Sequence, residues 1–354
     1  AEMLAELMRL KHGVVVAGSH GKTTTSAMIT QALTAAGFDP TSIIGGQPTG
    51  WSSSCRVGSG DLLVAEADES DGSFLHLTPT FALITNIDPE HLDHYGGDPA
   101  ALDAAFVELT ERVPFWGSLT LCADDEGVRR ILPHINRRFV RYGQADDADL
   151  RLTHVEVNEG GTTYRLQPRG EREVSGHLQL FGRHNALNAV GAVTMARELG
   201  VPVGLSVQAL AEFRGVDRRF TVRGEAGGVL VIDDYGHHPT EIRATLEAAR
   251  SAHPSRRLRV GFQPHRFSRT RDFFEAFAVS LDVADEVVIA PIYPAGESPI
   301  DGITARALAD ETSKRRAEQG RSPASSVDSL DALVQALSSD ARVVILRSDA
   351  PHRD

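Results

Sequence analysis

The feature that most constrains the fold of this chain is a glycine-rich loop between a short apolar run and a helical pattern. Residues 14–17 are Val-Val-Val-Ala, which predicts a buried strand, and residues 23–36 have a helical pattern that Gly37 ends. The loop at residues 18–25 reads Gly-Ser-His-Gly-Lys-Thr-Thr-Thr. A strand, a glycine-rich turn and a helix in this order predict a βα unit of an α/β domain.

The residue types in this loop indicate phosphate binding. Glycines let backbone amides close around a phosphate, and the N-terminus of the following helix favours its negative charge. Lys22 would neutralise the terminal phosphates, and Thr23 would place a hydroxyl on Mg²⁺. Only three of the 36 lysines and arginines are lysines, so a lysine in this loop is unusual. Because Val16 stands where a strict phosphate-loop motif has its first glycine, an ordinary strand-to-helix turn is the alternative.

Two more polar segments follow predicted strands. Residues 62–65 and 81–85 are buried-strand candidates; residues 66–71, Glu-Ala-Asp-Glu-Ser-Asp, follow the first, and His91 lies beyond the second. Four carboxylates in six residues are costly to place together without a cation, and hard oxygen ligands suit Mg²⁺. Glu66, as the first residue past its strand, is best placed to reach the phosphate loop, and His91 could bind a second divalent ion. A solvated acidic loop is the alternative.

The pattern changes after these segments. Residues 151–180 alternate apolar and polar positions around Glu159-Gly160-Gly161, which predicts an antiparallel hairpin at the sheet edge. A helix over residues 186–199 leads to a second α/β series. Its strands are expected at Val229–Ile232, Leu258–Phe262, Glu286–Ala290 and Arg342–Leu346. We therefore expect an α/β fold of two domains, residues 1–214 and 215–354, with mostly parallel sheets.

Two further groups of polar residues are binding candidates. Asn185 and Asn188 are three residues apart and share a helix face, so they could present amides to an adenine edge, or Asn185 could cap the helix. In the second series, residues 233–239 and 263–270 bring histidines, aspartates and arginines to the carboxyl ends of neighbouring strands. Open α/β sheets bind ligands at such ends, and arginine suits a carboxylate or phosphate. A surface charge network is the alternative.

Composition argues against several classes of function. The formal charge is −12 with no dense basic run, which disfavours binding to nucleic acid. No apolar run approaches the roughly 20 residues needed for membrane insertion. The two cysteines, Cys55 and Cys122, cannot form a disulfide framework, and a reducing cytoplasm suits them.

Taken together, these segments resemble the ATP-dependent Mur ligase family, and within it the alanine-adding branch. The resemblance rests on blocks in the family's order at residues 18–25, 66–71, 182–189, 233–239 and 262–270. It covers nearly the whole chain, to about residue 346. Later-acting members carry a lysine shortly after the histidine loop, whereas this chain has none between Lys22 and Lys314.

The resemblance implies a phosphate-loop type central ATPase domain followed by a Rossmann-like α/β domain. It implies a ligase of peptidoglycan-precursor synthesis that uses ATP and Mg²⁺ to join L-alanine to UDP-N-acetylmuramate through an acyl phosphate. Nucleotide binding would fall to Gly18, Ser19, His20, Gly21, Lys22, Thr23, Thr24, Asn185, Asn188, Arg219 and Asp234. Mg²⁺ would be held by Thr23, Glu66 and His91, and the alanine pocket would consist of Tyr235, His237, Arg266 and Arg269. The catalytic residues would be Lys22, Glu66, His91, His237 and Arg266.

The chain departs from the family at both ends. Family members begin with a UDP-binding domain and continue past the last strand into a glycine-rich turn and a helix; we expect this chain to lack both. One alternative is the related ligase that attaches a recycled murein tripeptide to UDP-N-acetylmuramate. The other is a nucleotide-binding fragment that is inactive without its N-terminal domain.

Overall fold

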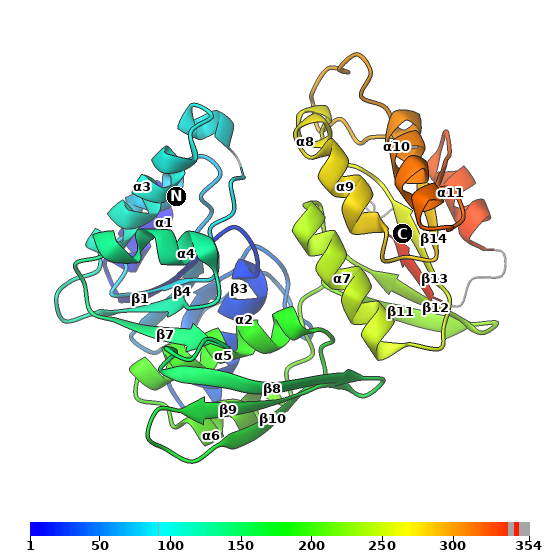
Figure 1. Ribbon diagram of the computed structural model, residues 1–354. Coiled ribbons are helices and arrows are strands. Elements are labelled where there is room, and N and C mark those ends of the chain that lie inside the picture. Colours follow the sequence, from blue (N-terminus) through cyan, green and yellow to red (C-terminus); the bar gives the residue numbers. More distant parts are fainter. Residues whose placement is uncertain (91, 339–342, 347–354) are drawn as a thin grey trace. The chain divides into compact units, whose positions relative to one another are not determined.

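The chain forms two compact α/β units, which we call unit 1 (Ala1–Val216) and unit 2 (Asp217–Asp354) (Figure 1). The computed structural model describes residues 1–90, 92–338 and 343–346. The division falls near the domain boundary predicted at residues 214–215. Each unit has a mostly parallel sheet, as the alternation of strand and helix patterns predicted.

Unit 1 is built on a ten-stranded sheet with the order β10-β9-β8-β7-β6-β5-β1-β4-β2-β3. Its strands are β1 (His12–Ala17), β2 (Thr41–Ile43), β3 (Cys55–Arg56), β4 (Leu62–Glu66), β5 (Phe81–Ile84), β6 (Ser118–Cys122), β7 (Phe139–Gly143), β8 (Leu150–Asn158), β9 (Gly161–Pro168) and β10 (Val174–Leu178). Neighbouring strands from β8 across to β2 run parallel. At one edge β8, β9 and β10 are antiparallel, so the predicted hairpin around residues 159–161 is confirmed.

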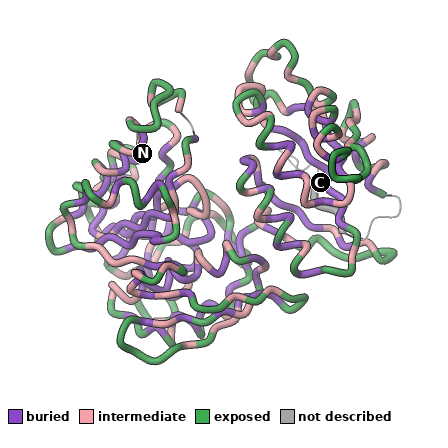
Figure 2. The backbone as a smooth tube through the Cα atoms, in the orientation of Figure 1, coloured by how far each residue is buried: buried purple, intermediate pink, exposed green. Residues whose placement is uncertain are grey.

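Helices cover both faces of this sheet. They are α1 (Glu2–Met8), α2 (Lys22–Ala35), α3 (Pro99–Glu111), α4 (Glu126–Ile131), α5 (Arg183–Glu198) and α6 (Val203–Leu210), with short 3₁₀ turns η1 (Ser73–His76), η2 (Leu92–Tyr95) and η3 (Leu132–His134). Successive strand residues face opposite sides, so Val14 and Val16 pack with α2, α5 and α6, whereas Val15 and Ala17 pack with α1, α3 and α4. The apolar run of β1 is thus buried on both faces (Figure 2).

Unit 2 has a six-stranded sheet with the order β11-β12-β16-β13-β14-β15. The strands are β11 (Thr221–Ala226), β12 (Val229–Asp233), β13 (Leu258–Phe262), β14 (Glu286–Ile289), β15 (Ser325–Ser326) and β16 (Val343–Leu346). The helices are α7 (Pro239–Ala252), α8 (Phe267–Asp272), α9 (Phe274–Leu281), α10 (Ala305–Glu318) and α11 (Leu330–Leu337). All neighbours run parallel except β11 and β12, and the predicted strands of the second series all lie in this sheet. Arg342, predicted to start the last strand, lies outside the described residues.

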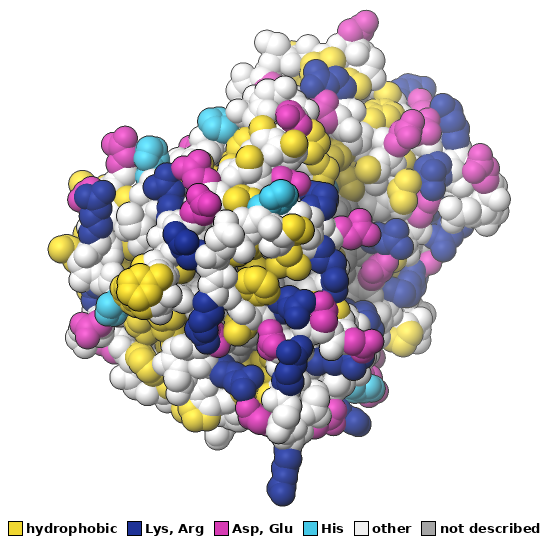
Figure 3. Space-filling view, turned by 60° about the vertical axis from the view of Figure 1, so that its left-hand side comes forward, with side chains coloured by type: hydrophobic (Ala, Val, Ile, Leu, Met, Phe, Trp, Pro, Cys, Tyr) yellow, Lys and Arg dark blue, Asp and Glu magenta, His cyan; other side chains and the backbone are white. Residues whose placement is uncertain are grey.

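The surface mixes charges of both signs. On the face shown in Figure 3, Asp and Glu side chains lie among the Lys and Arg side chains. Among the residues that the structure describes, no helix combines the length and apolar character needed to cross a membrane.

Candidate active site

The loop between β1 and α2 requires glycine at two positions. Gly18 has φ +124° and Gly21 has φ +79°, values that residues with a side chain rarely adopt. A Cβ atom at Gly18 would lie 2.2 Å from Thr85 Oγ1, and one at Gly21 would lie 2.6 Å from Asn188 Oδ1. The close neighbours therefore exclude side chains as firmly as the backbone angles do.

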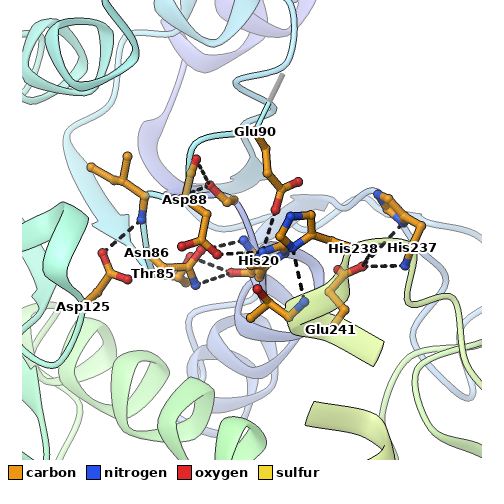
Figure 4. Close-up of polar contacts among 12 residues, drawn as sticks. His20, Thr85, Asn86, Asp88, Glu90, Asp125, His237, His238 and Glu241 are labelled. Carbon is orange, nitrogen blue, oxygen red and sulfur yellow. Dashed lines mark hydrogen bonds and ion pairs between the residues drawn. The ribbon is translucent and has the colours of Figure 1, made fainter. Parts of the chain in front are cut away.

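The residues that follow β5 hold this loop at His20 (Figure 4). The His20 N–H donates to Asn86 Oδ1 (2.7 Å), and the His20 carbonyl accepts from Asn86 Nδ2 (3.1 Å) and from Thr85 Oγ1 (2.7 Å). The imidazole Nε2 of His20 lies 2.9 Å from Asp88 Oδ2 and 2.6 Å from Glu90 Oε1. The loop backbone is therefore fixed in advance of any ligand, and the His20 side chain is directed at two carboxylates.

Lys22 pairs with a buried carboxylate of the acidic segment. Its Nζ lies 2.8 Å from Glu69 Oε2 and also donates to the Ser19 carbonyl (3.2 Å). The Glu69 side chain is 1% exposed and that of Lys22 13%. Burial raises the pKa of Glu69, although the charge of Lys22 acts to lower it. Burial also works to lower the pKa of Lys22, but the charge and hydrogen bond of Glu69 outweigh it and raise that pKa, so Lys22 stays protonated at the end of the loop.

Thr23 and Glu66 place oxygen atoms together beside the loop. Thr23 Oγ1 donates to Glu66 Oε1 (2.9 Å), and Glu66 Oε2 accepts from the Gly45 N–H (2.8 Å). The position predicted for Glu66 was wrong by one residue: it ends β4 rather than following it, because its backbone continues the parallel pairing with Val16. Hydroxyl and carboxylate oxygens are hard ligands, so this donor set fits Mg²⁺. The third predicted ligand, His91, lies outside the described residues.

Asn185 and Asn188 lie inside α5. The N-cap of α5 is Gly182, so the alternative that Asn185 caps the helix is wrong. Asn185 Nδ2 donates to the Phe181 carbonyl (2.8 Å), and Asn188 Nδ2 lies 3.4 Å from Asn185 Oδ1. Because Asn188 also lies against Gly21, the start of α5 is adjacent to the phosphate loop.

In unit 2, four aromatic rings form a row across the loops that follow β12, β13 and β14. The ring centroids are 5.5 Å apart for Tyr235 and His237, 6.4 Å for His237 and His265, and 5.4 Å for His265 and Tyr293. The last pair is stacked, with 17° between the planes. The structure therefore brings together the predicted pocket residues Tyr235 and His237 and adds Tyr293, which no motif indicated.

Asp234 supports the turn that carries Arg219. The carboxylate of Asp234 accepts from the Phe220 N–H (2.8 Å) and the Gly236 N–H (2.7 Å). Burial raises the pKa of Asp234, and the charge of Arg219 opposes this increase. The Arg219 guanidinium lies 5.6 Å from the centre of the Tyr235 ring. Asp234 is thus buried beneath the predicted site, where it fixes backbone, while Arg219 lies over an aromatic residue of the pocket.

Glu241 of α7 connects two predicted residues. Its Oε1 lies 3.2 Å from Arg219 Nη1, and its Oε2 accepts from the His237 N–H (2.9 Å), a contact visible in Figure 4. Sequence reasoning missed Glu241. The sequence did carry a signal. A glutamate two residues after the proline in His-His-Pro lies in the first turn of a helix, where its side chain can accept hydrogen bonds from backbone N–H groups just before the helix.

Arg266 and Arg269 lie where the chain leaves β13 for α8. Arg266 has φ +69°, and its N–H donates to the Tyr293 carbonyl (2.8 Å). The Arg269 Nη1 atom lies 3.4 Å from His265 Nδ1. Both arginines are therefore attached to the aromatic row, Arg266 through its backbone and Arg269 through its side chain.

These two groups of residues suit different chemistry. The loop in unit 1 offers backbone amides, a protonated lysine and paired oxygen ligands, which suit a polyphosphate and its metal ion. The cluster in unit 2 offers arginines beside aromatic and imidazole rings, which suit a small carboxylate-bearing molecule.

Comparisons with known proteins match the two units to two separate family models. A family model described as the Mur ligase middle domain matches residues 16–196, which is half of the chain, and one described as the Mur ligase, glutamate ligase domain matches residues 218–347. The UDP-N-acetylmuramate–L-alanine ligase of Geobacter sulfurreducens is 49% identical over 314 residues, covering 89% of this chain and 68% of the relative. The chain thus spans about two thirds of that relative's length.

Solved structures show the same fold. A UDP-N-acetylmuramate–alanine ligase from Thermotoga maritima has a TM-score of 0.80 and 28% identity, covering 98% of this chain and 74% of that one. A MurF ligase from Thermotoga maritima in complex with ADP has a TM-score of 0.75 and 22% identity, covering 98% of this chain and 79% of that one. With both units matched by family models and a relative of 49% identity, the chain belongs to the Mur ligase family.

Proposed function

We propose that this chain is an ATP-dependent ligase that joins L-alanine to the carboxylate of UDP-N-acetylmuramate in peptidoglycan-precursor synthesis. The observation that carries the proposal is the relationship to an enzyme of that name across both units. The geometry supports it, because Lys22, Thr23 and Glu66 lie together at the glycine-rich loop of unit 1, and arginines lie beside aromatic rings in unit 2, a combination that suits a carboxylate.

In the first step, a carboxylate oxygen of UDP-N-acetylmuramate attacks the γ-phosphorus of ATP. The bond from that phosphorus to the β–γ bridging oxygen breaks, so ADP leaves and an acyl phosphate remains. Lys22 and the amides of residues 18–24 neutralise the phosphate charge. Thr23, Glu66 and His91 would hold Mg²⁺, which screens the phosphate oxygens when bound. Asn185 and Asn188 would contact the adenine.

In the second step, the amine of L-alanine attacks the acyl carbon, and phosphate leaves from a tetrahedral intermediate. Arg266 and Arg269 bind the carboxylate of L-alanine, while Tyr235 and His237 line the pocket and orient the amine. Arg219 contacts the nucleotide, and Asp234 holds the turn that carries it. Catalysis by positioning and charge neutralisation suits a reaction of this kind.

We place the reaction in the cytoplasm, because it consumes ATP and a nucleotide-linked sugar. The two unpaired cysteines, Cys55 and Cys122, are compatible with a reducing compartment.

An assay with each candidate substrate in turn tests this function. Purified chain receives ATP, Mg²⁺ and UDP-N-acetylmuramate with L-alanine, with the tripeptide L-alanyl-D-glutamyl-diaminopimelate, or with neither, and phosphate release is measured. Release that depends on L-alanine supports the proposal. Release that depends only on the tripeptide would favour the murein-recycling ligase. ATP binding without release in any arm would favour a nucleotide-binding fragment.

A further inference from the structure

The segment after β14, residues 291–297, is bound along the loop that carries Arg266. The Tyr293 N–H donates to the Pro264 carbonyl (2.8 Å), and the Arg266 N–H donates back to the Tyr293 carbonyl (2.8 Å). The rings of His265 and Tyr293 stack beside this pair of bonds. The backbone on the N-terminal side of Arg266 is therefore fixed by the neighbouring loop.

Glu297 fixes the other side of Arg266. The Ser268 N–H donates to Glu297 Oε2 (2.9 Å), and the Ser268 hydroxyl donates to Glu297 Oε1 (2.6 Å), so both carboxylate oxygens are used. Burial works to raise the pKa of Glu297, but the hydrogen bonds from Ser268 and Phe267 and the charge of Arg266 outweigh it and lower that pKa. Glu297 is therefore ionised at neutral pH and accepts hydrogen bonds from Ser268, two residues after Arg266.

Arg266 itself has a conformation that arginine rarely adopts. Its φ of +69° and ψ of +139° lie in a region that glycine tolerates and that residues with a Cβ atom adopt only under strain. The Arg266 carbonyl accepts from the Thr270 N–H (3.1 Å) and the Thr270 hydroxyl (2.7 Å). Such a conformation persists only when surrounding contacts over-determine it, and these contacts come from α8 and from the 291–297 segment.

We propose that Glu297 is a positioning residue for Arg266: by binding Ser268 it holds the strained turn that directs the Arg266 guanidinium toward the carboxylate of the amino-acid substrate. The direction of the guanidinium rests on the proposed function, in which Arg266 binds L-alanine. The role of Glu297 in maintaining the strained backbone is independent of that function.

A thermal double-mutant cycle tests the backbone role without using activity. Glu297→Gln is introduced into the wild type, into Arg266→Ala and into Arg266→Gly. Alanine removes the charge of Arg266 but keeps a Cβ atom and hence the strain, whereas glycine removes both. We expect Glu297→Gln to lower Tm by about 3 °C in the first two backgrounds, and by less than half of that with glycine. Equal losses in all three backgrounds would overturn the proposal. The matched control is Glu275→Gln, at an exposed glutamate of α9, which should change Tm by the same amount in all three backgrounds.

Steady-state kinetics test the functional half. In Glu297→Gln, KM for L-alanine should rise at least about tenfold, while kcat and KM for ATP change less than about twofold. Parallel losses in every parameter would mean that Glu297 only stabilises unit 2. If the wild type shows no L-alanine-dependent phosphate release, the proposed function fails, and the thermal cycle still decides whether Glu297 holds the strained turn.

Discussion

The loop after β1 in unit 1 and the loops around the aromatic row in unit 2 both need residues with positive φ, but they obtain them differently. In unit 1 these residues are Gly18 and Gly21. In unit 2 they are Arg218, Phe220 and Arg266, with φ of +62°, +53° and +69°, together with Ala295 (+48°) and Gly296 (+89°). The loop of unit 1 has glycine at both of these positions, whereas the loops of unit 2 also place residues with large side chains at positive φ.

The difference follows from which part of the residue does the binding. A phosphate loop binds through backbone amides, so a Cβ atom adds nothing and, at Gly18, would meet Thr85 Oγ1 at 2.2 Å. At Arg266 the proposed binding group is the guanidinium, which glycine would remove, and neighbouring contacts hold the strained backbone.

The largest effect should come from Lys22. We expect Lys22→Met to lower turnover at least about a hundredfold, because the positive charge that neutralises the phosphates is lost. It should also lower Tm, since Glu69 is left buried without its partner. The double variant Lys22→Met/Glu69→Gln should recover Tm but not turnover. Recovery of turnover in the double variant would mean that Lys22 serves only the ion pair.

Two substitutions at residues with positive φ should change the free energy of unfolding in opposite directions. Gly18→Ala should lower the free energy of unfolding by about 2 kcal/mol or more, because of strain and the clash with Thr85. Arg266→Gly should raise it by up to about 1 kcal/mol, because relief of strain exceeds the added backbone entropy of glycine. Urea unfolding measures both. A destabilising Arg266→Gly would remove the contrast between the two units.

A substitution at Glu66 should change the Mg²⁺ concentration that turnover requires. Glu66→Gln keeps the shape of the side chain and removes its charge, so the Mg²⁺ concentration for half-maximal turnover should rise about tenfold. Asp68→Asn is the matched control in the same acidic segment. An unchanged Mg²⁺ titration in Glu66→Gln would exclude Glu66 from the metal site.

The smallest effect is an opposite pH dependence of stability in the two units. The pKa of Glu69 is raised, so between its ordinary and raised values the native state binds the extra proton, and stability relative to Glu69→Gln falls as pH rises. The pKa of Glu297 is lowered, so the unfolded state binds the extra proton, and stability relative to Glu297→Gln rises with pH. Tm measured across the acidic range for each pair gives the slopes. Slopes of the same sign would contradict one of these two assignments.

Much of the fold could be predicted from the sequence because its signals are local. The continuous apolar run of β1 indicates a strand buried on both faces, and Gly37 marks the end of α2 within a residue or two. Polar segments after β4, β5, β12 and β13 were placed at the correct edges of their sheets because parallel strands share that edge.

The supporting residues could not be predicted in the same way. Glu69 was only one carboxylate among several, and its pairing with Lys22 depends on the turn after β4. Tyr293 and Glu297 lie far along the chain from Arg266 and meet it only through the neighbouring β14. Contacts between separate loops depend on the completed sheet, so no local pattern carries them.

The scarcity of lysine has a practical consequence for chemical labelling. An amine-acylating reagent finds three lysine side chains in this sequence, together with the amino terminus. Lys314 is 73% exposed, the Lys11 ammonium donates to backbone carbonyls including that of Gly60, and the Lys22 side chain is 13% exposed and paired with Glu69. Acylation should therefore reach Lys314 first and Lys22 last. Trypsin does not cleave after an acylated lysine, so mass spectrometry of the tryptic peptide that spans Lys22 would then report on the occupancy of the phosphate loop.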